Sequence, residues 1–78
     1  MSVAIDVYYR KPRDSQREAA IAECLANQDG RVTYSDEDSP TTICLAAEFT
    51  SWEAAEAATA ALQRIGEYVE GPYDYGDD

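Results

Sequence analysis

The stretch that decides the fold runs from residue 42 to residue 66 and reads TICLAAEFTSWEAAEAATAALQRIG. Over residues 42–49, apolar side chains fall at every second position, which is the period of a strand with one buried face. After that the period becomes helical, and Thr50 with Glu53 has the spacing of a capping box that opens a helix. The apolar stripe of this helix consists of Trp52, Ala55, Thr59, Leu62 and Ile65, with Ala58 and Ala61 beside it. We expect Gly66 to end the helix.

The first half of the chain repeats this plan. Residues 3–10 alternate with the period of a half-buried strand, and Ser15 with Glu18 forms a second capping box. The helix that begins there is expected to extend to about Gln28, with Gly30 closing it in a conformation of positive φ. Short strands are predicted around residues 32–34, after the first helix, and over residues 67–70, after the second.

The resulting order, β-α-β-β-α-β, predicts an α+β fold of the ferredoxin-like kind: a four-stranded antiparallel sheet with two helices on one face. We expect residues 1–72 to form one small domain and residues 73–78 an acidic, aromatic tail. The strand residues expected to face the helices are Val3, Ile5, Val7, Val32, Tyr34, Ile43, Leu45, Ala47 and Phe49. Their expected partners on the helices are Ile21, Leu25, Trp52, Leu62 and Ile65.

Such a fold leaves the second face of the sheet without helices. On the first strand this face would carry Asp6, Tyr8 and Arg10, and on the strand at residues 42–49 it would carry Cys44, Ala46 and Glu48. Small side chains at the centre, with an aromatic ring and carboxylates around them, suit contact with another protein. The sequence therefore predicts an open sheet face that is available for a partner.

The chain is strongly acidic and contains no histidine: 16 acidic residues against 6 basic ones give a net charge of −10. Residues 1–17 carry four basic and two acidic side chains, and the remaining residues carry two basic and 14 acidic ones. Nucleic acid and anionic membranes repel such a surface, whereas a basic protein surface attracts it. The absence of histidine excludes catalytic and metal sites that depend on imidazole.

Other chemistry has little support in the sequence. The chain has two cysteines, no glycine-rich phosphate loop and no CxxC motif, and residues 36–38 resemble a solvated turn more than a calcium loop. We therefore expect neither enzymatic activity nor a cofactor nor a metal site. Because the sequence also shows no signal peptide and no apolar run of membrane-spanning length, we expect a cytoplasmic protein with reduced cysteines.

Regularly spaced carboxylates with tyrosines among them mark the C-terminal part of the chain. Such carboxylates imitate a phosphate backbone, and tyrosines provide rigid contact area. In size and charge the chain is similar to small acidic phage proteins, including anti-CRISPR proteins and other DNA mimics. Our leading hypothesis is a non-enzymatic inhibitor that blocks a basic, nucleic-acid-contacting surface of a partner protein. The expected partner-binding residues are Glu53, Glu56, Glu67, Tyr68, Glu70, Tyr73, Asp74, Tyr75, Asp77 and Asp78.

Three other interpretations stay open at this point. The chain could be a ferredoxin-like homodimer, joined through the open sheet face, that serves as a structural or small-ligand-binding module. It could be an immunity protein or antitoxin that caps a basic toxin. The acidic surface could also serve only to keep the domain in solution.

Overall fold

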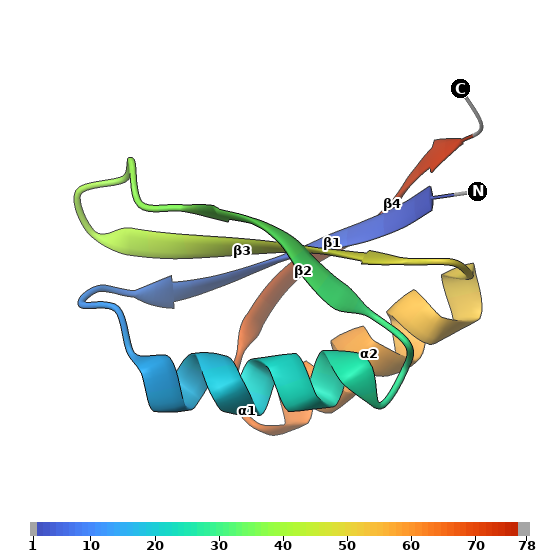
Figure 1. Cartoon of the computed structure of the whole chain (residues 1–78), viewed down its shortest axis with the longest axis horizontal. Coiled ribbons are helices and arrows are strands. Elements are labelled where there is room, and N and C mark those ends of the chain that lie inside the picture. Colours follow the sequence, from blue (N-terminus) through green and yellow to red (C-terminus); the bar gives the residue numbers. More distant parts are fainter. Residues whose placement is uncertain (1, 77–78) are drawn as a thin grey trace.

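A computed structural model describes residues 2–76 of the chain and contains four strands and two helices in the described part (Figure 1). In chain order these are β1 (Ser2–Arg10), α1 (Ser15–Ala26), β2 (Arg31–Asp36), β3 (Thr42–Phe49), α2 (Trp52–Arg64) and β4 (Tyr68–Gly76). The four strands form one antiparallel sheet in the order β2-β3-β1-β4. The predicted ferredoxin-like α+β fold is confirmed.

Both helices lie on the same side of the sheet, and the other side carries no helix of the described chain (Figure 1). The central strands β1 and β3 bury every second side chain beneath the helices, and the alternation predicted for both strands is confirmed. The fully buried side chains come from the sheet and from one stripe on each helix. The core consists of Val3, Ile5, Val7, Tyr9, Ile43, Leu45, Ala47 and Phe49 from the strands, and of Ile21, Leu25, Ala55, Ala58 and Leu62 from the helices.

Both helices are capped one residue away from the predicted position. The side chain of Asp14, and not that of Ser15, accepts a hydrogen bond from the amide of Arg17 at the start of α1. At the start of α2, Ser51 caps the helix in place of Thr50 by accepting from the amide of Ala54. Neighbouring residues of similar capping chemistry are hard to rank from sequence, and the extended backbone at Asp14 and Ser51 decides between them.

A bulge in β2 reverses the side of the sheet on which Tyr34 lies. Val32 is opposite Ala47, but Tyr34 is opposite Ala46, so β2 contains one extra residue at Thr33. Because side chains alternate with a period of two, one inserted residue moves all the following ones to the other face. The prediction that Tyr34 faces the helices is therefore wrong, and Val32, on the edge strand, is 39% exposed.

The helix stripe on α2 is narrower than predicted. Ala55, Ala58 and Leu62 are fully buried, whereas Trp52 is 38% exposed and Ile65 is 53% exposed. Trp52 is the first residue of the helix and Ile65 is its C-cap, so both lie at ends where the sheet covers the helix least. The assignment of Trp52 and Ile65 to the core is wrong. The alanines allow α2 to approach the sheet closely.

Gly30 is required for packing, and not for the positive φ that we expected. The residue of positive φ at the end of α1 is Asp29, with φ at 60°. A Cβ atom added to Gly30 would lie 2.1 Å from the Phe49 ring. The close approach of the chain to Phe49 therefore accounts for this glycine.

The last strand is longer than predicted and includes residues that we expected in a tail. β4 pairs with β1 up to Gly76, although the register shifts at Gly71 and Pro72. Gly71 has a φ of 110° that favours glycine, and its Cβ would meet the Ala4 carbonyl oxygen at 3.1 Å. Proline is tolerated here because β4 is an edge strand. The predicted end of the strand at residue 70 is thus wrong.

These burial differences predict unequal effects of two truncations in α2. Leu62→Ala should lower the free energy of unfolding by about 2–5 kcal/mol, since it leaves a cavity in the core. Trp52→Ala should cost clearly less, although it removes a larger side chain, because Trp52 lies at the edge of the core. Urea denaturation followed by circular dichroism measures both values. A Trp52→Ala loss as large as that of Leu62→Ala would restore Trp52 to the core.

Candidate protein-binding face

The side of the sheet without helices includes three complete rows of four side-chain positions, each row running across the strands from β2 to β4. The first row is Asp36, Cys44, Tyr8 and Tyr68, the second is Tyr34, Ala46, Asp6 and Glu70, and the third is Arg31, Glu48, Ala4 and Tyr73. We call these twelve residues the open face. They include four carboxylates, four tyrosines and one basic residue, Arg31. The alternation of β1 places a second basic residue, Arg10, on the same side, one position beyond the first row and opposite Thr42, as predicted. The predicted placement of Asp6 and Tyr8 beside Cys44 and Ala46 is confirmed.

The centre of the open face consists of short side chains, and exposed tyrosines lie at its edges. Cys44, Ala46 and Ala4 are short side chains, whereas Tyr34 and Tyr68 are each 60% exposed and rise from the two edge strands. Tyr68 packs on Tyr8 across β1 and β4, with ring centroids 6.0 Å apart. Exposed rings around small side chains form a contact surface of the kind found at protein interfaces.

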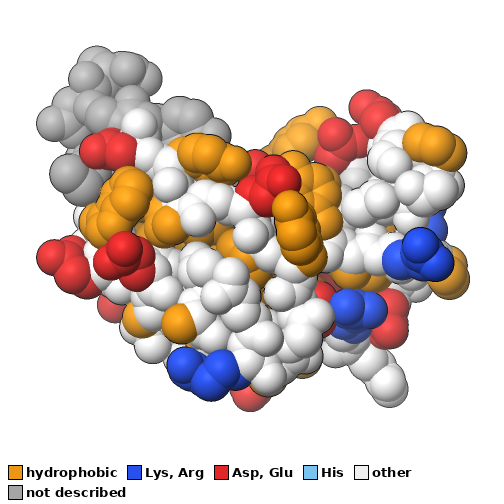
Figure 2. All heavy atoms as spheres, turned by 180° about the vertical axis from the view of Figure 1, so that it is seen from behind, with side chains coloured by type: hydrophobic (Ala, Val, Ile, Leu, Met, Phe, Trp, Pro, Cys, Tyr) orange, Lys and Arg blue, Asp and Glu red, His pale blue; other side chains and the backbone are white. Residues whose placement is uncertain are grey.

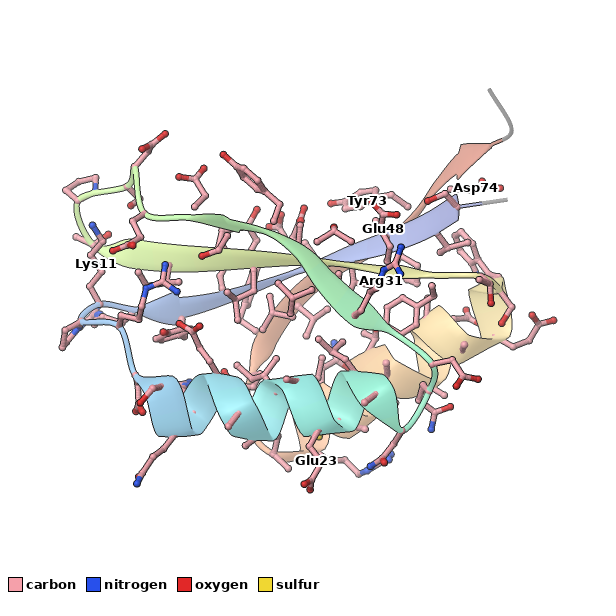
Figure 3. The ribbon with its side chains drawn as sticks, viewed as in Figure 1. Lys11, Glu23, Arg31, Glu48, Tyr73 and Asp74 are labelled. Carbon is pink, nitrogen blue, oxygen red and sulfur yellow. The ribbon has the colours of Figure 1, made fainter. Side chains whose placement is uncertain are left out.

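Figure 2 shows hydrophobic and acidic side chains interleaved along the upper part of this view, while the basic ones lie below them, some at the right and some at the bottom left of centre. Figure 3 shows Tyr73 on the side of the sheet away from the helices and Glu23 pointing outward from α1. Arg31 and Glu48 lie together where β2 crosses β3 (Figure 3). The single cation of the open face is thus placed at a corner and beside a carboxylate.

Two carboxylates of the open face lie directly opposite each other. Asp6 on β1 is paired in register with Glu70 on β4, and like charges in this arrangement destabilise a sheet. Burial, together with the charge of Glu70, raises the pKa of Asp6 above its ordinary value of 3.8. The Asp6–Glu70 pair is therefore electrostatically unfavourable, and it lies on the face of the sheet that takes no part in packing the core.

A cavity of about 300 Å³ lies beside Tyr8 on the open face. It is lined by Tyr8, Asp36, Ser39, Thr42 and Cys44. Burial raises the pKa of the Cys44 thiol, and the charges of Asp6, Asp36 and Glu70 raise it further. Burial likewise raises the pKa of Tyr8, and Cys44, Asp6 and Glu70 add to that shift. Burial and the surrounding carboxylates therefore favour the protonated form of the Cys44 thiol.

The basic N-terminal segment is engaged in contacts within the domain. Arg13 forms ion pairs with Glu18 at 3.0 Å and with Glu37 at 2.9 Å, so it links the start of α1 to the β2–β3 loop. Glu18 also accepts a hydrogen bond from the Tyr9 hydroxyl. Lys11 Nζ donates to the Glu37 carbonyl oxygen at 2.8 Å. Of the basic residues at this end, Arg13 therefore neutralises acidic groups of the chain itself, and Lys11 binds a backbone carbonyl.

Glu67, which we predicted to bind a partner, lies inside the domain. Its side chain is 6% exposed and accepts three hydrogen bonds from the Arg17 guanidinium at 2.9–3.1 Å. The same guanidinium lies over the Tyr9 ring, 5.1 Å from its centroid. Glu67 joins α1 to the start of β4 and adds no exposed charge, so the expectation of an exposed acid here is wrong.

The other predicted residues are divided between two sides of the molecule. Tyr68, Glu70 and Tyr73 lie on the open face, while Glu53 and Glu56 are exposed on α2 in the helical layer. Asp74 is exposed and lies opposite Val3 near the end of β4. The side chain of Tyr75, together with Asp77 and Asp78, lies outside the described residues. The structure thus brings three of the ten together and adds Asp6, Tyr8, Tyr34, Asp36 and Glu48 to them.

Asp6, Tyr8 and Glu48 were already predicted on the open sheet face from the alternation of two strands, whereas Tyr34 and Asp36 were not. The alternation of Tyr68 and Glu70 about Val69 places both on one face, and β1 already supplied Asp6 and Tyr8. Tyr34 and Asp36 follow the bulge at Thr33, and Tyr73 follows the register shift at residues 71–72. No local pattern marks the bulge at Thr33, whereas Gly71-Pro72 does mark the second irregularity, which we had interpreted as the end of the strand.

Other chemical features of the described chain are few. A second cavity, of about 290 Å³, is lined by Ser2, Asp29, Arg31, Glu48, Phe49 and Thr50. Within residues 2–76, no three histidine, cysteine, aspartate or glutamate side chains are grouped so that they could hold a metal ion. Neither helix of the described chain is long and apolar enough to cross a membrane.

Comparisons of this chain with protein-family models, with curated proteins and with solved structures give no match. Any functional conclusion must therefore come from the geometry and charge of the open face.

The Asp6–Glu70 pair predicts that Asp6→Asn stabilises the domain at neutral pH. A folded-state pKa raised above the unfolded value contributes stability at low pH that is lost as the pH rises through the folded pKa. Asp6→Asn removes this loss, so its melting temperature should exceed that of the wild type at pH 7, and the difference should vanish below pH 3.8. Thermal melts from pH 3 to 8 measure this. A difference that does not change with pH would contradict it.

Glu67→Gln and Glu70→Gln make the same chemical change three residues apart and should act in opposite directions. Glu67→Gln removes the charge partner of Arg17 and should cost about 1–2 kcal/mol, less than for a fully buried pair because the Arg17 side chain is 40% exposed. Glu70→Gln removes repulsion on Asp6 and should leave stability unchanged or increase it. Urea denaturation at pH 7 compares the two variants, and equal losses of stability would contradict the different roles assigned to Glu67 and Glu70.

Proposed function

We propose that this chain is a non-enzymatic protein-binding inhibitor that covers a basic, nucleic-acid-contacting surface of a partner protein. The open face is the surface that makes the contact. This role is similar in kind to that of anti-CRISPR proteins and other DNA mimics, and it places the chain in the cytoplasm with its partner.

The observation that carries the proposal is the composition of the open face. Four carboxylates and four tyrosines share one side of the sheet, and the two basic residues on that side, Arg31 at a corner and Arg10 beyond the first row, lie at its margins. The sheet holds its carboxylates at a fixed spacing. They can therefore pair with the basic side chains of a partner protein that otherwise contact phosphates. Tyrosines provide contact area at little cost in conformational entropy. A surface with both features fits a basic protein site.

The same charges disfavour two other occupants of the open face. Nucleic acid is repelled by the four carboxylates and finds no basic field around the tyrosines. A second copy of the chain would bring Asp6 and Glu70 of one molecule near the carboxylates of the other. Like-charge contacts across an interface cost several kcal/mol. The open face therefore favours a partner of opposite charge over a homodimer.

The proposal predicts that the chain and duplex DNA compete for one protein. The immobilised chain is incubated at low salt with nuclease-treated extract from the cell of origin or its host, and retained protein is eluted with a short DNA duplex. We expect a nucleic-acid-binding protein to elute, because both ligands occupy the same basic surface. Retention should also decrease as salt rises.

A second experiment tests the blocking mechanism: the purified partner is mixed first with the chain and then with DNA, or in the reverse order. If the chain blocks the nucleic-acid site, no complex containing partner, chain and DNA should appear in native electrophoresis. A stable ternary complex would contradict the blocking mechanism. A retained toxin that contacts no nucleic acid would assign the chain to the immunity or antitoxin class instead.

A further inference from the structure

We infer that the cavity beside Tyr8 receives an arginine side chain of the partner protein. This inference rests on the proposed function, and it names the chemical group that the open face recognises. It assigns a single position on the domain, at the first row of the open face, where the central part of the sheet meets the β2–β3 loop.

The cavity has the shape and lining for one long side chain. Its volume is about 300 Å³, which is the lower end of the range of ligand pockets. Cys44 contributes a half-buried, uncharged floor, and Tyr8 contributes an aromatic wall against which the aliphatic part of an arginine can pack. Ser39 and Thr42 add hydroxyl groups to the lining. None of these side chains carries a positive charge.

Three carboxylates from three different strands act on this cavity. Asp36 lies in its wall, and Asp6 and Glu70 lie in the next row, close enough for all three to affect the ionisation of Cys44. The unfavourable pairing of Asp6 with Glu70 is relieved when a cation is bound nearby. Neither the first nor the second row contains a basic side chain, and Arg10 and Arg31 lie in the rows on either side of them. The carboxylates of these two rows therefore favour a positive charge supplied by a partner.

The geometry favours arginine over lysine. A guanidinium is planar, donates to carboxylates in a fork and stacks on aromatic rings, whereas an ammonium is a compact and strongly hydrated charge. Tyr8 and Tyr68 form a tilted pair of rings beside the carboxylates of Asp6 and Glu70. This combination of ring faces and paired carboxylates suits a flat cation. Arginine is also common on surfaces that contact nucleic acid.

The experiment measures binding of three synthetic octapeptides, of arginine, lysine or citrulline, by isothermal titration calorimetry and by amide chemical shifts at 150 mM salt. Citrulline keeps the shape of arginine without its charge. We expect the arginine peptide to bind more tightly than the lysine peptide and the citrulline peptide not to bind. The largest shifts should fall on Asp6, Tyr8, Asp36 and Cys44. Equal affinity for arginine and lysine peptides, or shifts spread over both helices, would overturn the inference.

Two triple variants with the same net charge separate the cavity from general attraction. Asp6→Asn, Asp36→Asn and Glu70→Gln neutralise the open face, while Glu23→Gln, Glu53→Gln and Glu56→Gln neutralise three exposed acids in the helical layer. Each set changes the net charge from −10 to −7. The open-face variant should lose about tenfold in affinity for the arginine peptide and the control less than twofold.

Equal losses in the two triple variants would overturn the arginine site but leave a charge-driven inhibitor intact. Failure of the proposed function is detected in a different experiment, the native electrophoresis, if the retained protein binds DNA and this chain at the same time. Circular dichroism of both variants establishes that they are folded, and gel filtration with light scattering establishes that each is monomeric. A dimer of the wild type that the open-face variant disrupts would also overturn the inference, because a second copy would then occupy this face.

Discussion

The structure depends on one constraint: two helices can cover only one face of a four-stranded sheet. In a chain of 78 residues, this leaves the alternate side chains of every strand facing solvent. The buried half is conventional, with Val, Ile and Leu on β1 and β3 under α1 and α2. The strand side chains on the face without helices do not have to pack into the core, so other requirements, such as solubility, determine their composition. Here that face carries carboxylates and tyrosines around a centre of small side chains.

The periodicity of the sequence predicted the architecture because it records burial directly. Strands β1 and β3 and both helices follow from apolar spacing, and the fold follows from their order. Periodicity fails at irregularities of the backbone. One extra residue at Thr33 moves Tyr34 from the helical side to the open face, and the shift at Gly71 and Pro72 extends β4 beyond its predicted end. Both irregularities lie in edge strands, which have a partner on one side only.

The candidate site was harder to predict than the fold, because two glutamates that look alike in the sequence can have different surroundings in the structure. Glu67 and Glu70 are three residues apart, yet Glu67 is buried against Arg17 and Glu70 lies on the open face beside Asp6. Sequence spacing gave both the same role. The distinction depends on Arg17, which is fifty residues from Glu67 in the chain and reaches it only after α1 has packed against the sheet. Long-range ion pairs of this kind leave no local signal.

The distribution of cations therefore carries more functional information than the net charge does. Arg13 and Arg17 compensate Glu18, Glu37 and Glu67, where the elements meet and where stability benefits. Asp6 and Glu70 face each other with no comparable cation in register, although a single basic residue on a neighbouring strand would relieve them. A domain this small has little stability to spare. Under the proposed function, the positive charge that would relieve this repulsion comes from the partner protein.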